Sequence, residues 1–283
     1  MLSIIICNRE QSITPVLAEN IHNTVGVEHE IVSIDNSRGQ YNIFQAYNEG
    51  VRQAKGDILC FMHDDVLFKG NGWGATVERI FAEDEKLGAL GVDGGHFMPN
   101  CPCSWTSCHT TSFHTWRDDK DGVCREYSNK EFSNGHRLVE VASIDGLWMC
   151  IRRSLFDSIH FDDKTFSGFH CYDSDICMQI LNAGYRIKVT YDIDIIHNSD
   201  GTYNPTFFKN LELWHAKWHN QLPVVRGIDL TEREQKIHTR YAIELMERLR
   251  NDAMLYNRLH SPEYRLGHFL LKPWRFIKKY ISL

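Results

Sequence analysis

The feature that most constrains the fold is the alternation, over the first ninety residues, of short apolar runs with segments whose apolar residues recur at helical spacing. Phe44, Tyr47, Val51 and Ala54, for example, share one face of a helix expected over residues 41–55. The pattern predicts strands and helices in turn, with strands over residues 2–7, 30–34, 58–62 and 88–92 and helices over residues 15–23, 41–55 and 73–82. Strand–helix–strand units of this length build a mostly parallel sheet flanked by helices, an α/β fold.

Composition excludes several other classes of protein. The chain of 283 residues is 42% hydrophobic and 24% charged, with seven prolines, which excludes disordered, collagen-like and coiled-coil chains. No apolar run approaches the ~20 residues of a membrane span, and the first residues lack the basic stretch of a signal peptide. Nine cysteines, an odd number, argue against a disulfide framework, so we expect a cytoplasmic protein with reduced thiols.

Charge is unevenly distributed along the chain. The net charge is −6, but residues 211–283 hold 13 Lys and Arg against 8 Asp and Glu, whereas residues 1–210 hold 18 against 29. An acidic body disfavours a nucleic-acid partner. The basic end permits contact with an anionic surface.

The rest of the chain is less regular. Residues 93–140 are rich in Gly, Cys, His, Ser and Trp without a clear period, which predicts an irregular insertion or a small antiparallel piece. Further elements are expected as a strand over 139–143, a helix starting near Arg153, a helix over 171–183 ended by Gly184, strands over 185–190 and 193–196, and a long helix over 231–259. We therefore divide the chain into a domain over residues 1–210 and a helical extension over residues 211–283.

The extension is open to two interpretations. Residues 266–283 alternate large apolar residues with basic ones, a pattern typical of an amphipathic helix lying on a membrane, here the inner face of a cell membrane. The same segment could instead pack on the body or on the second subunit of a homodimer. Phe207, Trp214 and Trp218 are spaced for one helical face, which we expect to dock the extension onto the sheet domain.

Polar residues follow the predicted strands. The clusters are Asp35-Asn-Ser37, His63-Asp-Asp65, Asp145-Gly146, residues 169–175 and residues 197–201. Each alone is explained by a turn or by acids in the first turn of a helix. Together, carboxylates and imidazoles after successive parallel strands meet at one edge of the sheet, where a divalent cation could be held.

Four segments carry a resemblance to a known family. Residues 33–37 and 48–57 look like a donor-base loop and the helix after it, and residues 61–66, Phe-Met-His-Asp-Asp-Val, stand where an Asp-x-Asp motif belongs. Residues 166–186, which end in Gly-Tyr-Arg, look like a helix with a catalytic acidic pair. Over roughly residues 2–205 the chain resembles the family 2-like glycosyltransferases of GT-A fold. The histidine-bearing form of these motifs is similar to the form found in a bacterial subgroup that includes streptomycin-biosynthesis-type transferases.

The resemblance implies a divalent cation, Mn²⁺ or Mg²⁺, with altered ligands. His63 stands where the family usually has the first Asp of Asp-x-Asp, and Asp65 matches the second. Imidazole shifts the preference toward Mn²⁺. His197 is a further candidate ligand. Asp64 is a spare acid that could shift into the role of the missing ligand, and it is counted among the donor-binding residues.

The resemblance also implies a mechanism. Tyr172-Asp173 stands where the family commonly has Glu-Asp, so the position of the base is kept. Asp173 would take the proton from an acceptor hydroxyl as it attacks the anomeric carbon, a displacement that inverts configuration, while the cation neutralises the leaving nucleoside diphosphate. Asp35 would bind the donor base, by resemblance the uracil of a UDP-sugar, and Asp145 the donor sugar or the acceptor. His170 could help to bind the acceptor.

Residues 101–124 hold further residues whose role the sequence leaves open. The cysteines and histidines there are Cys101, Cys103, Cys108, His109, His114 and Cys124. Their spacing does not match the paired Cys-x2-Cys ligands of structural zinc, so zinc is left out of the predicted site. Trp105, Phe113 and Trp116 could form a platform for a sugar ring or a small core of their own.

The sequence therefore predicts an inverting, metal-dependent glycosyltransferase. It would move a sugar from a nucleotide sugar to a carbohydrate or lipid-linked hydroxyl acceptor, in the synthesis of a bacterial surface glycan or a glycosylated metabolite. The altered cation motif leaves open a non-catalytic relative that binds a nucleotide sugar. A nucleotidyltransferase would need a Gly-rich basic loop after the first strand, where residues 7–10 offer only Arg9 and no glycine.

Overall fold

A computed structural model describes residues 1–119, 121–133, 135–199 and 201–260. Its main sheet has seven strands in the order β10-β13-β5-β12-β3-β1-β2. They are β1 (Leu2–Asn8), β2 (His29–Asp35), β3 (Ile58–Met62), β5 (Leu87–Gly91), β10 (Leu138–Val141), β12 (Trp148–Arg152) and β13 (Arg186–Thr190). β10 and β12 run antiparallel to their neighbours, and the other five strands share one direction. The predicted mostly parallel α/β sheet is confirmed.

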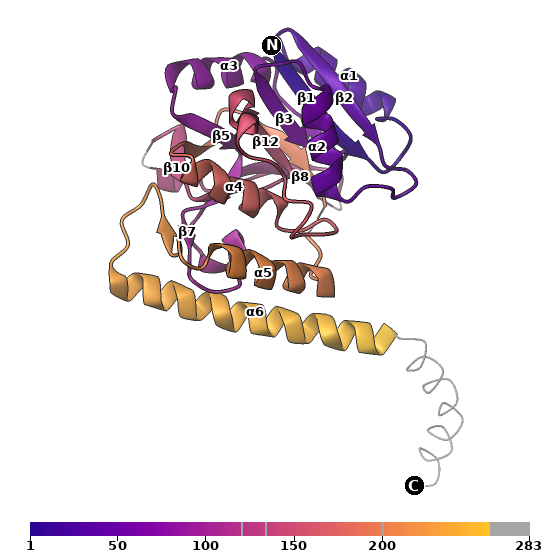
Figure 1. Cartoon of the computed structure of the whole chain (residues 1–283). Helices are drawn as coiled ribbons and strands as arrows, with labels where there is room; N and C mark the ends of the chain where they lie inside the picture. The colour runs from indigo at the N-terminus through magenta and orange to yellow at the C-terminus, as the bar shows by residue number, and fades with distance from the viewer. Residues whose placement is uncertain (120, 134, 200, 261–283) are drawn as a thin grey trace, which may run out of the picture.

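Helices cover both faces of this sheet (Figure 1). α1 (Pro15–Thr24) and α3 (Trp73–Glu83) contribute to one buried apolar cluster, and α2 (Ile43–Gln53) and α4 (Tyr172–Asn182) contribute to the other. In β1, Ile4 and Ile6 point into the first cluster and Ile5 into the second, because successive side chains of a strand face opposite sides. A strand that is apolar on both sides requires helices on both sides.

Residues 93–140 contribute to a second sheet rather than to an irregular insertion. This sheet has the order β11-β6-β8-β14-β4, and β9 pairs with β8. Its strands are β4 (Val66–Phe68), β6 (Asp93–Gly95), β8 (Thr111–Asp118), β9 (Cys124–Ser128), β11 (Ser143–Ile144) and β14 (Ile195–His197). Within the segment, β6 and β9 pair with β8 in antiparallel fashion. Strands from outside the segment complete the sheet, and one of them, β14, is parallel to β8. The single strand predicted over residues 139–143 is two strands, β10 and β11, which belong to different sheets.

Three short 3-10 helices lie between these elements in the described part of the chain. They are η1 (Trp105–Cys108), η2 (Lys130–Ser133) and η3 (Arg153–Asp157). The helix predicted to start near Arg153 is the single turn η3. Gly184, with φ of 81°, follows α4 as predicted for a residue after a helix end, where the left-handed conformation favours glycine.

The C-terminal region packs on the sheet domain through two helices. α5 (Pro205–Trp218) buries Trp214 and Trp218, as predicted, and the boundary predicted at residue 210 lies within this helix. β15 (Val224–Val225) pairs with β7 (Phe97–Met98), and α6 (Glu232–His260) then runs alongside α5 (Figure 1). The predicted capping box starts α6: Thr231 Oγ1 accepts from the Glu234 backbone N–H, and Glu234 Oε2 accepts from the Thr231 backbone N–H.

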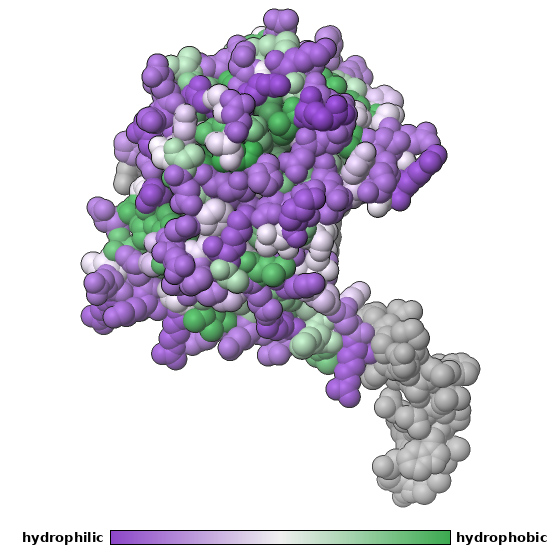
Figure 2. All heavy atoms as spheres, in the orientation of Figure 1, coloured by the Kyte–Doolittle hydropathy of each residue, from purple (hydrophilic) through white to green (hydrophobic). Residues whose placement is uncertain are grey.

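The amphipathic segment predicted over residues 266–283 lies outside the described residues. Within the described ranges, no helix is both long enough and apolar enough to cross a membrane. Figure 2 shows a mainly hydrophilic surface on the viewed face, interrupted by small apolar patches.

Candidate functional site

A cavity of about 1080 Å³ lies at the edge of the main sheet where β1, β2 and β3 end. Its walls come from the residues that follow these strands, the N-terminus of α4 and the segment after β14. The cavity therefore lies at the carboxyl ends of strands that are far apart in sequence, which is where ligands bind in α/β sheets. Its volume is large enough for a ligand of several rings.

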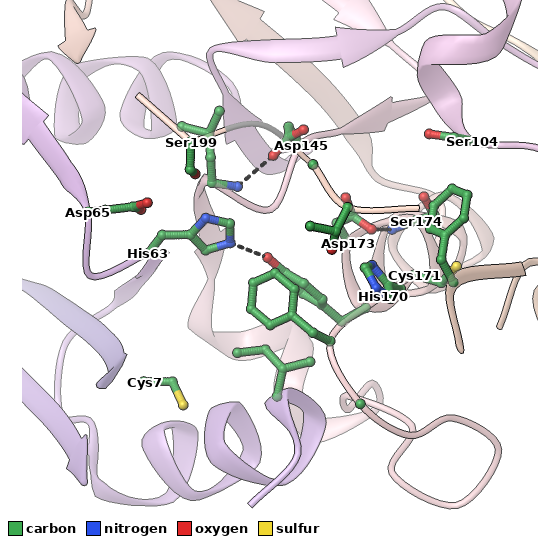
Figure 3. Close-up of a pocket in the computed structure, with 18 of the residues that line it drawn as sticks. Cys7, His63, Asp65, Ser104, Asp145, His170, Cys171, Asp173, Ser174 and Ser199 are labelled. Carbon is green, nitrogen blue, oxygen red and sulfur yellow. Dashed lines mark hydrogen bonds between the residues drawn. The ribbon is translucent and has the colours of Figure 1, made fainter. Parts of the chain in front are cut away.

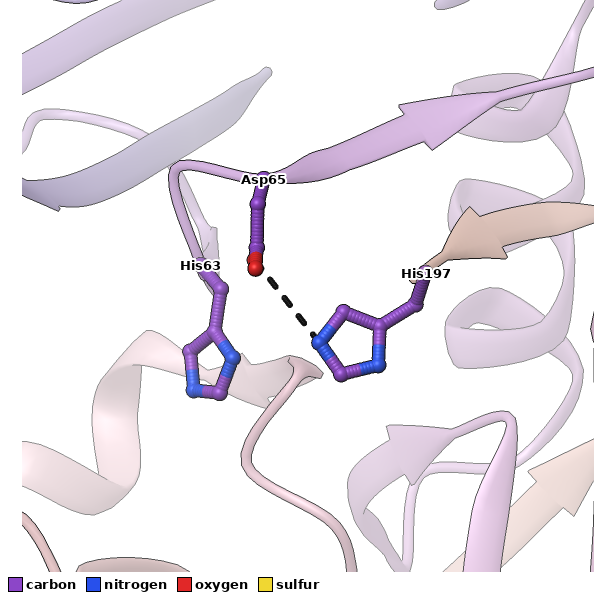
Figure 4. A group of neighbouring side chains, drawn as sticks. All are labelled: His63, Asp65 and His197. Carbon is purple, nitrogen blue, oxygen red and sulfur yellow. Dashed lines mark ion pairs between the residues drawn. The ribbon is translucent and has the colours of Figure 1, made fainter. Parts of the chain in front are cut away.

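Three side chains in this cavity, here called the cation group, are placed to share one divalent ion. They are His63, Asp65 and His197, and one potential ligand atom from each lies within 4.8 Å of the others (Figure 4). His197 Nε2 lies 3.7 Å from Asp65 Oδ1. Within the described ranges no other group of three His, Cys, Asp or Glu side chains meets this condition. The nitrogen and oxygen donors fit Mn²⁺, which accepts both.

Strand pairing explains how the cation group forms. His63 and Asp65 lie between β3 and β4, and His197 ends β14. β4 and β14 are antiparallel, with His197 opposite Val66, so the imidazole stands beside Asp65. The structure thus brings together the three residues that the sequence proposed as ligands.

The surroundings of His63 favour its neutral form. Burial is the largest influence on its pKa and lowers it, although Asp145 and Asp65 act in the opposite direction. A neutral imidazole has the free electron pair that a metal ligand needs. The ring Nε2 lies 2.7 Å from Tyr172 Oη.

A second set of side chains, here called the acid group, lines another part of the cavity. It consists of Asp93, Asp145 and Asp173. Burial, and then the nearby Asp145, raises the pKa of Asp173 to about 7. The same two causes raise the pKa of Asp93 to about 7. Carboxyl groups with such pKa values exchange protons near neutrality, which is what a general base requires.

Backbone amides fix the orientation of two of these carboxylates (Figure 3). The Gly146 N–H donates to Asp173 Oδ2 at 3.3 Å, and the Ser174 N–H donates to Asp173 Oδ1 at 2.7 Å. The Leu147 N–H donates to Asp145 Oδ1 at 2.8 Å. Asp173 lies in the first turn of α4 and is therefore held by its own helix and by the turn at Gly146.

Asp93 was not among the predicted site residues. It directly follows the strand predicted over residues 88–92, so the rule that identified the other polar clusters applies to it as well. The irregular composition of residues 93–140 concealed it. Its Oδ1 accepts a hydrogen bond from the backbone N–H of His114, in the second sheet.

Two predicted donor-site residues have other partners. Asp64 accepts hydrogen bonds from the Arg9 guanidinium, with Nη2 donating to Oδ1 at 2.6 Å and Nε donating to Oδ2 at 3.0 Å. Asp64 is not in the cation group. Asp35 accepts hydrogen bonds from Ser37, and it does not line the cavity, whereas the adjacent Asn36 does. A role for Asp35 in binding the donor base stays a prediction.

Asp175, two residues after Asp173, has a structural role. Its carboxylate is buried and accepts hydrogen bonds from Trp218 Nε1 at 2.8 Å and Lys217 Nζ at 3.0 Å. These contacts fix α5 against α4. Phe207 and His170 line the cavity, with their rings 5.2 Å apart.

Some residues of the segment 101–124 line the cavity, and others are buried in the core. Cys101, Cys103 and Cys108 are buried, and within the described part of the chain they form no group with the geometry of a metal site. Trp105 lines the cavity, whereas Trp116 does not line it and lies beneath Lys69, with Nζ 3.0 Å from the ring centre. Of the three aromatic residues considered for a sugar platform, only Trp105 lines the cavity.

Comparison with known proteins identifies the family. The model of a family described as "Glycosyltransferase like family" matches residues 3–207. The chain belongs to this family. The resemblance seen in its sequence is thereby confirmed at the level of the family.

The solved structure of a glycosyltransferase shares the fold. GalNAc-T7, in a complex with UDP, GalNAc and Mn²⁺, matches 95% of this chain with a TM-score of 0.52 and 11% sequence identity. The chain spans 58% of the length of that protein. The mannosyltransferase PcManGT from Pyrobaculum calidifontis, in a complex with GDP-Man and Mn²⁺, has a TM-score of 0.47 at 13% identity, covering 97% of this chain and 87% of its own. No curated protein matches the chain in sequence.

Proposed function

We propose that this glycosyltransferase moves a sugar from a nucleoside diphosphate sugar, with UDP favoured, to a hydroxyl group of a carbohydrate or lipid-linked acceptor, with inversion at the anomeric carbon. The observation that carries the proposal is that one cavity contains both a group suited to a divalent cation and a desolvated carboxyl suited to a base. GalNAc-T7, which shares the fold, binds UDP and Mn²⁺. A bacterial surface glycan or a glycosylated metabolite is the proposed product.

The cation group would hold Mn²⁺, or Mg²⁺ less well, beside the diphosphate. When bound there, the ion supplies positive charge to stabilise the leaving group. Arg9 lines the same cavity and is oriented by its two hydrogen bonds to Asp64. We assign Arg9 to the diphosphate as well, so that Asp64 serves the donor site through the guanidinium.

Asp173 would act as the base. Its raised pKa, about 7, makes its carboxylate a better proton acceptor than an exposed aspartate, and the two backbone N–H donors keep it in one orientation. It would remove the proton of the acceptor hydroxyl as that oxygen attacks the sugar. Attack from the side opposite the leaving diphosphate inverts the configuration. His170 and Phe207, which line the cavity beside α4, would contact the acceptor.

Thermal shift against UDP, GDP, CDP and dTDP, each with and without Mn²⁺, tests the donor site. We expect one nucleotide to raise the melting temperature only when Mn²⁺ is present. If no nucleotide stabilises the protein, the proposed donor site is wrong. A nucleotide that binds while no donor sugar is ever turned over would favour the alternative of a non-catalytic nucleotide-sugar-binding protein.

A further inference from the structure

The two motif positions at which this chain carries unexpected side chains are in direct contact. His63 belongs to the cation group, and Tyr172 precedes the proposed base. His63 Nε2 and Tyr172 Oη are 2.7 Å apart, the contact drawn as a dashed line from His63 in Figure 3. The two residues are separated by 109 positions in the sequence, so only the fold brings them together.

The Tyr172 hydroxyl is held in one place. The side chain is 4% exposed, and its ring centre lies 5.5 Å from that of Tyr47 and 6.3 Å from that of Phe44, both in edge-on geometry. The hydroxyl fills the space beside Gly146, where an added Cβ would lie 2.1 Å from it. Gly146 therefore has to be glycine for this hydroxyl to reach His63.

The remaining nitrogen of His63 faces the other ligands. Figure 4 shows one ring nitrogen of His63 on the side of Asp65 and His197 and the other on the far side. Since Nε2 contacts Tyr172, the nitrogen that faces Asp65 and His197 is Nδ1. A ligand nitrogen must be unprotonated, so the proton of the neutral ring has to be on Nε2.

We propose that Tyr172 is a positioning residue for cation binding. It accepts a hydrogen bond from His63 Nε2–H, which selects this tautomer and aims the Nδ1 electron pair at the ion. Oxygen acceptors behind a ligand histidine commonly orient it in this way. The inference deepens the proposed function and rests on its cation site.

The segments around this contact also hold the proposed base. The His63 backbone N–H donates to the Leu147 carbonyl at 3.0 Å, and the Gly146 N–H donates to Asp173 Oδ2 at 3.3 Å. Tyr172 and Asp173 are consecutive residues of α4. One short turn and one helix end thus hold both the cation ligand and the base.

The first test is the tautomer of His63 in the metal-free protein. Long-range ¹H–¹⁵N NMR distinguishes the two ring nitrogens, and the signal that disappears in His63→Ala belongs to His63. We expect the Nε2-protonated tautomer in the wild-type protein and a mixture of tautomers in Tyr172→Phe. A Nδ1-protonated ring in the wild-type protein, or an unchanged tautomer in Tyr172→Phe, would overturn the proposal.

The second test measures Mn²⁺ affinity without any donor, from the electron paramagnetic resonance signal of free Mn²⁺. Tyr172→Phe removes one hydroxyl and should weaken binding by on the order of tenfold or more. Tyr191→Phe is the matched control, because it removes the hydroxyl of another buried tyrosine, one that bonds Asn129 and does not line the cavity. We expect Tyr191→Phe to bind as the wild-type protein does. Equal effects of the two substitutions would show that Tyr172 acts only through packing.

A double substitution tests whether the effect passes through His63. In a His63→Ala background, Tyr172→Phe should cause no further loss of Mn²⁺ affinity, because the residue that it positions is gone. A further loss as large as in the wild-type background would overturn the proposal. If the wild-type protein binds no Mn²⁺, the cation site of the proposed function fails, whereas the tautomer of His63 still decides whether Tyr172 positions the ring.

Discussion

The cation group and the acid group line one cavity but differ in what surrounds their aspartates. In the cation group, Asp65 stands beside the imidazoles of His63 and His197. In the acid group, burial is the largest influence on Asp93 and Asp173 and raises both pKa values to about 7. The same residue type, aspartate, is therefore suited to hold a cation at one place and to exchange a proton at the other. The surroundings, more than the residue type, decide the role.

The largest expected effect tests the acid group. Asp173→Asn keeps the shape of the side chain and one of its two accepting oxygens but removes the proposed base. We expect turnover to fall by on the order of 10²-fold or more, with donor binding nearly unchanged. Steady-state kinetics and calorimetry with the nucleotide measure the two quantities. Unchanged turnover would remove Asp173 from the role of base.

The second-largest expected effect compares Asp65, in the cation group, with the adjacent Asp64. Removing a residue that hydrogen-bonds to a metal ligand weakens metal binding by about 10- to 100-fold. Asp65→Asn removes the charge of a proposed ligand itself, so it should weaken Mn²⁺ binding by at least about tenfold. Asp64→Asn is the control, because Asp64 contacts Arg9 and not the cation group. It should affect affinity for the nucleoside diphosphate more than affinity for Mn²⁺ alone. Equal losses of Mn²⁺ affinity would place both acids at the ion.

The pH dependence of the reaction separates the two groups further. A base with a pKa of about 7 is active as its carboxylate, so kcat/KM should rise with pH and level off above pH 7. Asp145→Asn removes a nearby negative charge, which lowers the cost of ionising Asp173. The midpoint of the profile should then move to lower pH. A midpoint that stays in place would show that Asp145 does not influence the base.

The smallest effect concerns stability. The folded-state pKa of Asp93 lies above its unfolded value, so the folded protein binds more protons between about pH 4 and pH 7 and loses stability as pH rises through that window. Asp93→Asn removes this loss and keeps an oxygen for the His114 N–H. We expect the free energy of unfolding at pH 8 to increase by about 1 kcal/mol, measured by denaturant titration with a chelator present.

An exposed residue provides the control for the stability measurement. Asp252 lies on α6 with its side chain 67% exposed, and Asp252→Asn should change stability little at either pH. If Asp93→Asn has no larger effect at pH 8 than at pH 4, Asp93 is not desolvated, and the contrast between the two groups loses one of its supports.

Much of the fold could be predicted because its signals are local. Helical spacing over residues 41–55 and the apolar run at 58–62 are each complete within a short segment, and α2 and β3 form there. The second sheet could not be predicted in the same way. Its strand β6 has the sequence Asp-Gly-Gly, which carries no alternation, and it forms because β8 and β11 pair with it.

The site shows the same division. Asp145 and the three cation ligands were proposed from their positions at the ends of strands, and Asp173 from a helix that resembles the family's catalytic motif. The structure places all five in one cavity. Asp93 was missed although it follows a strand, because the segment after it has no regular pattern. The partner of Asp64 could not be anticipated, since Arg9 is 55 residues away and only the adjacency of β1 and β3 joins them.

The sequence alone determined the order of strands and helices and the polar residues that follow the strands, because side-chain periodicity is set by neighbours along the chain. Only the tertiary structure decided which side chains those residues contact and how far they are shielded from water. The pairing of β4 with β14 brings His197 to Asp65, and the packing of α4 brings Tyr172 to His63. Packing also removes water from Asp173 and raises its pKa. Contacts and desolvation depend on segments that are distant in sequence, so no local pattern contains them.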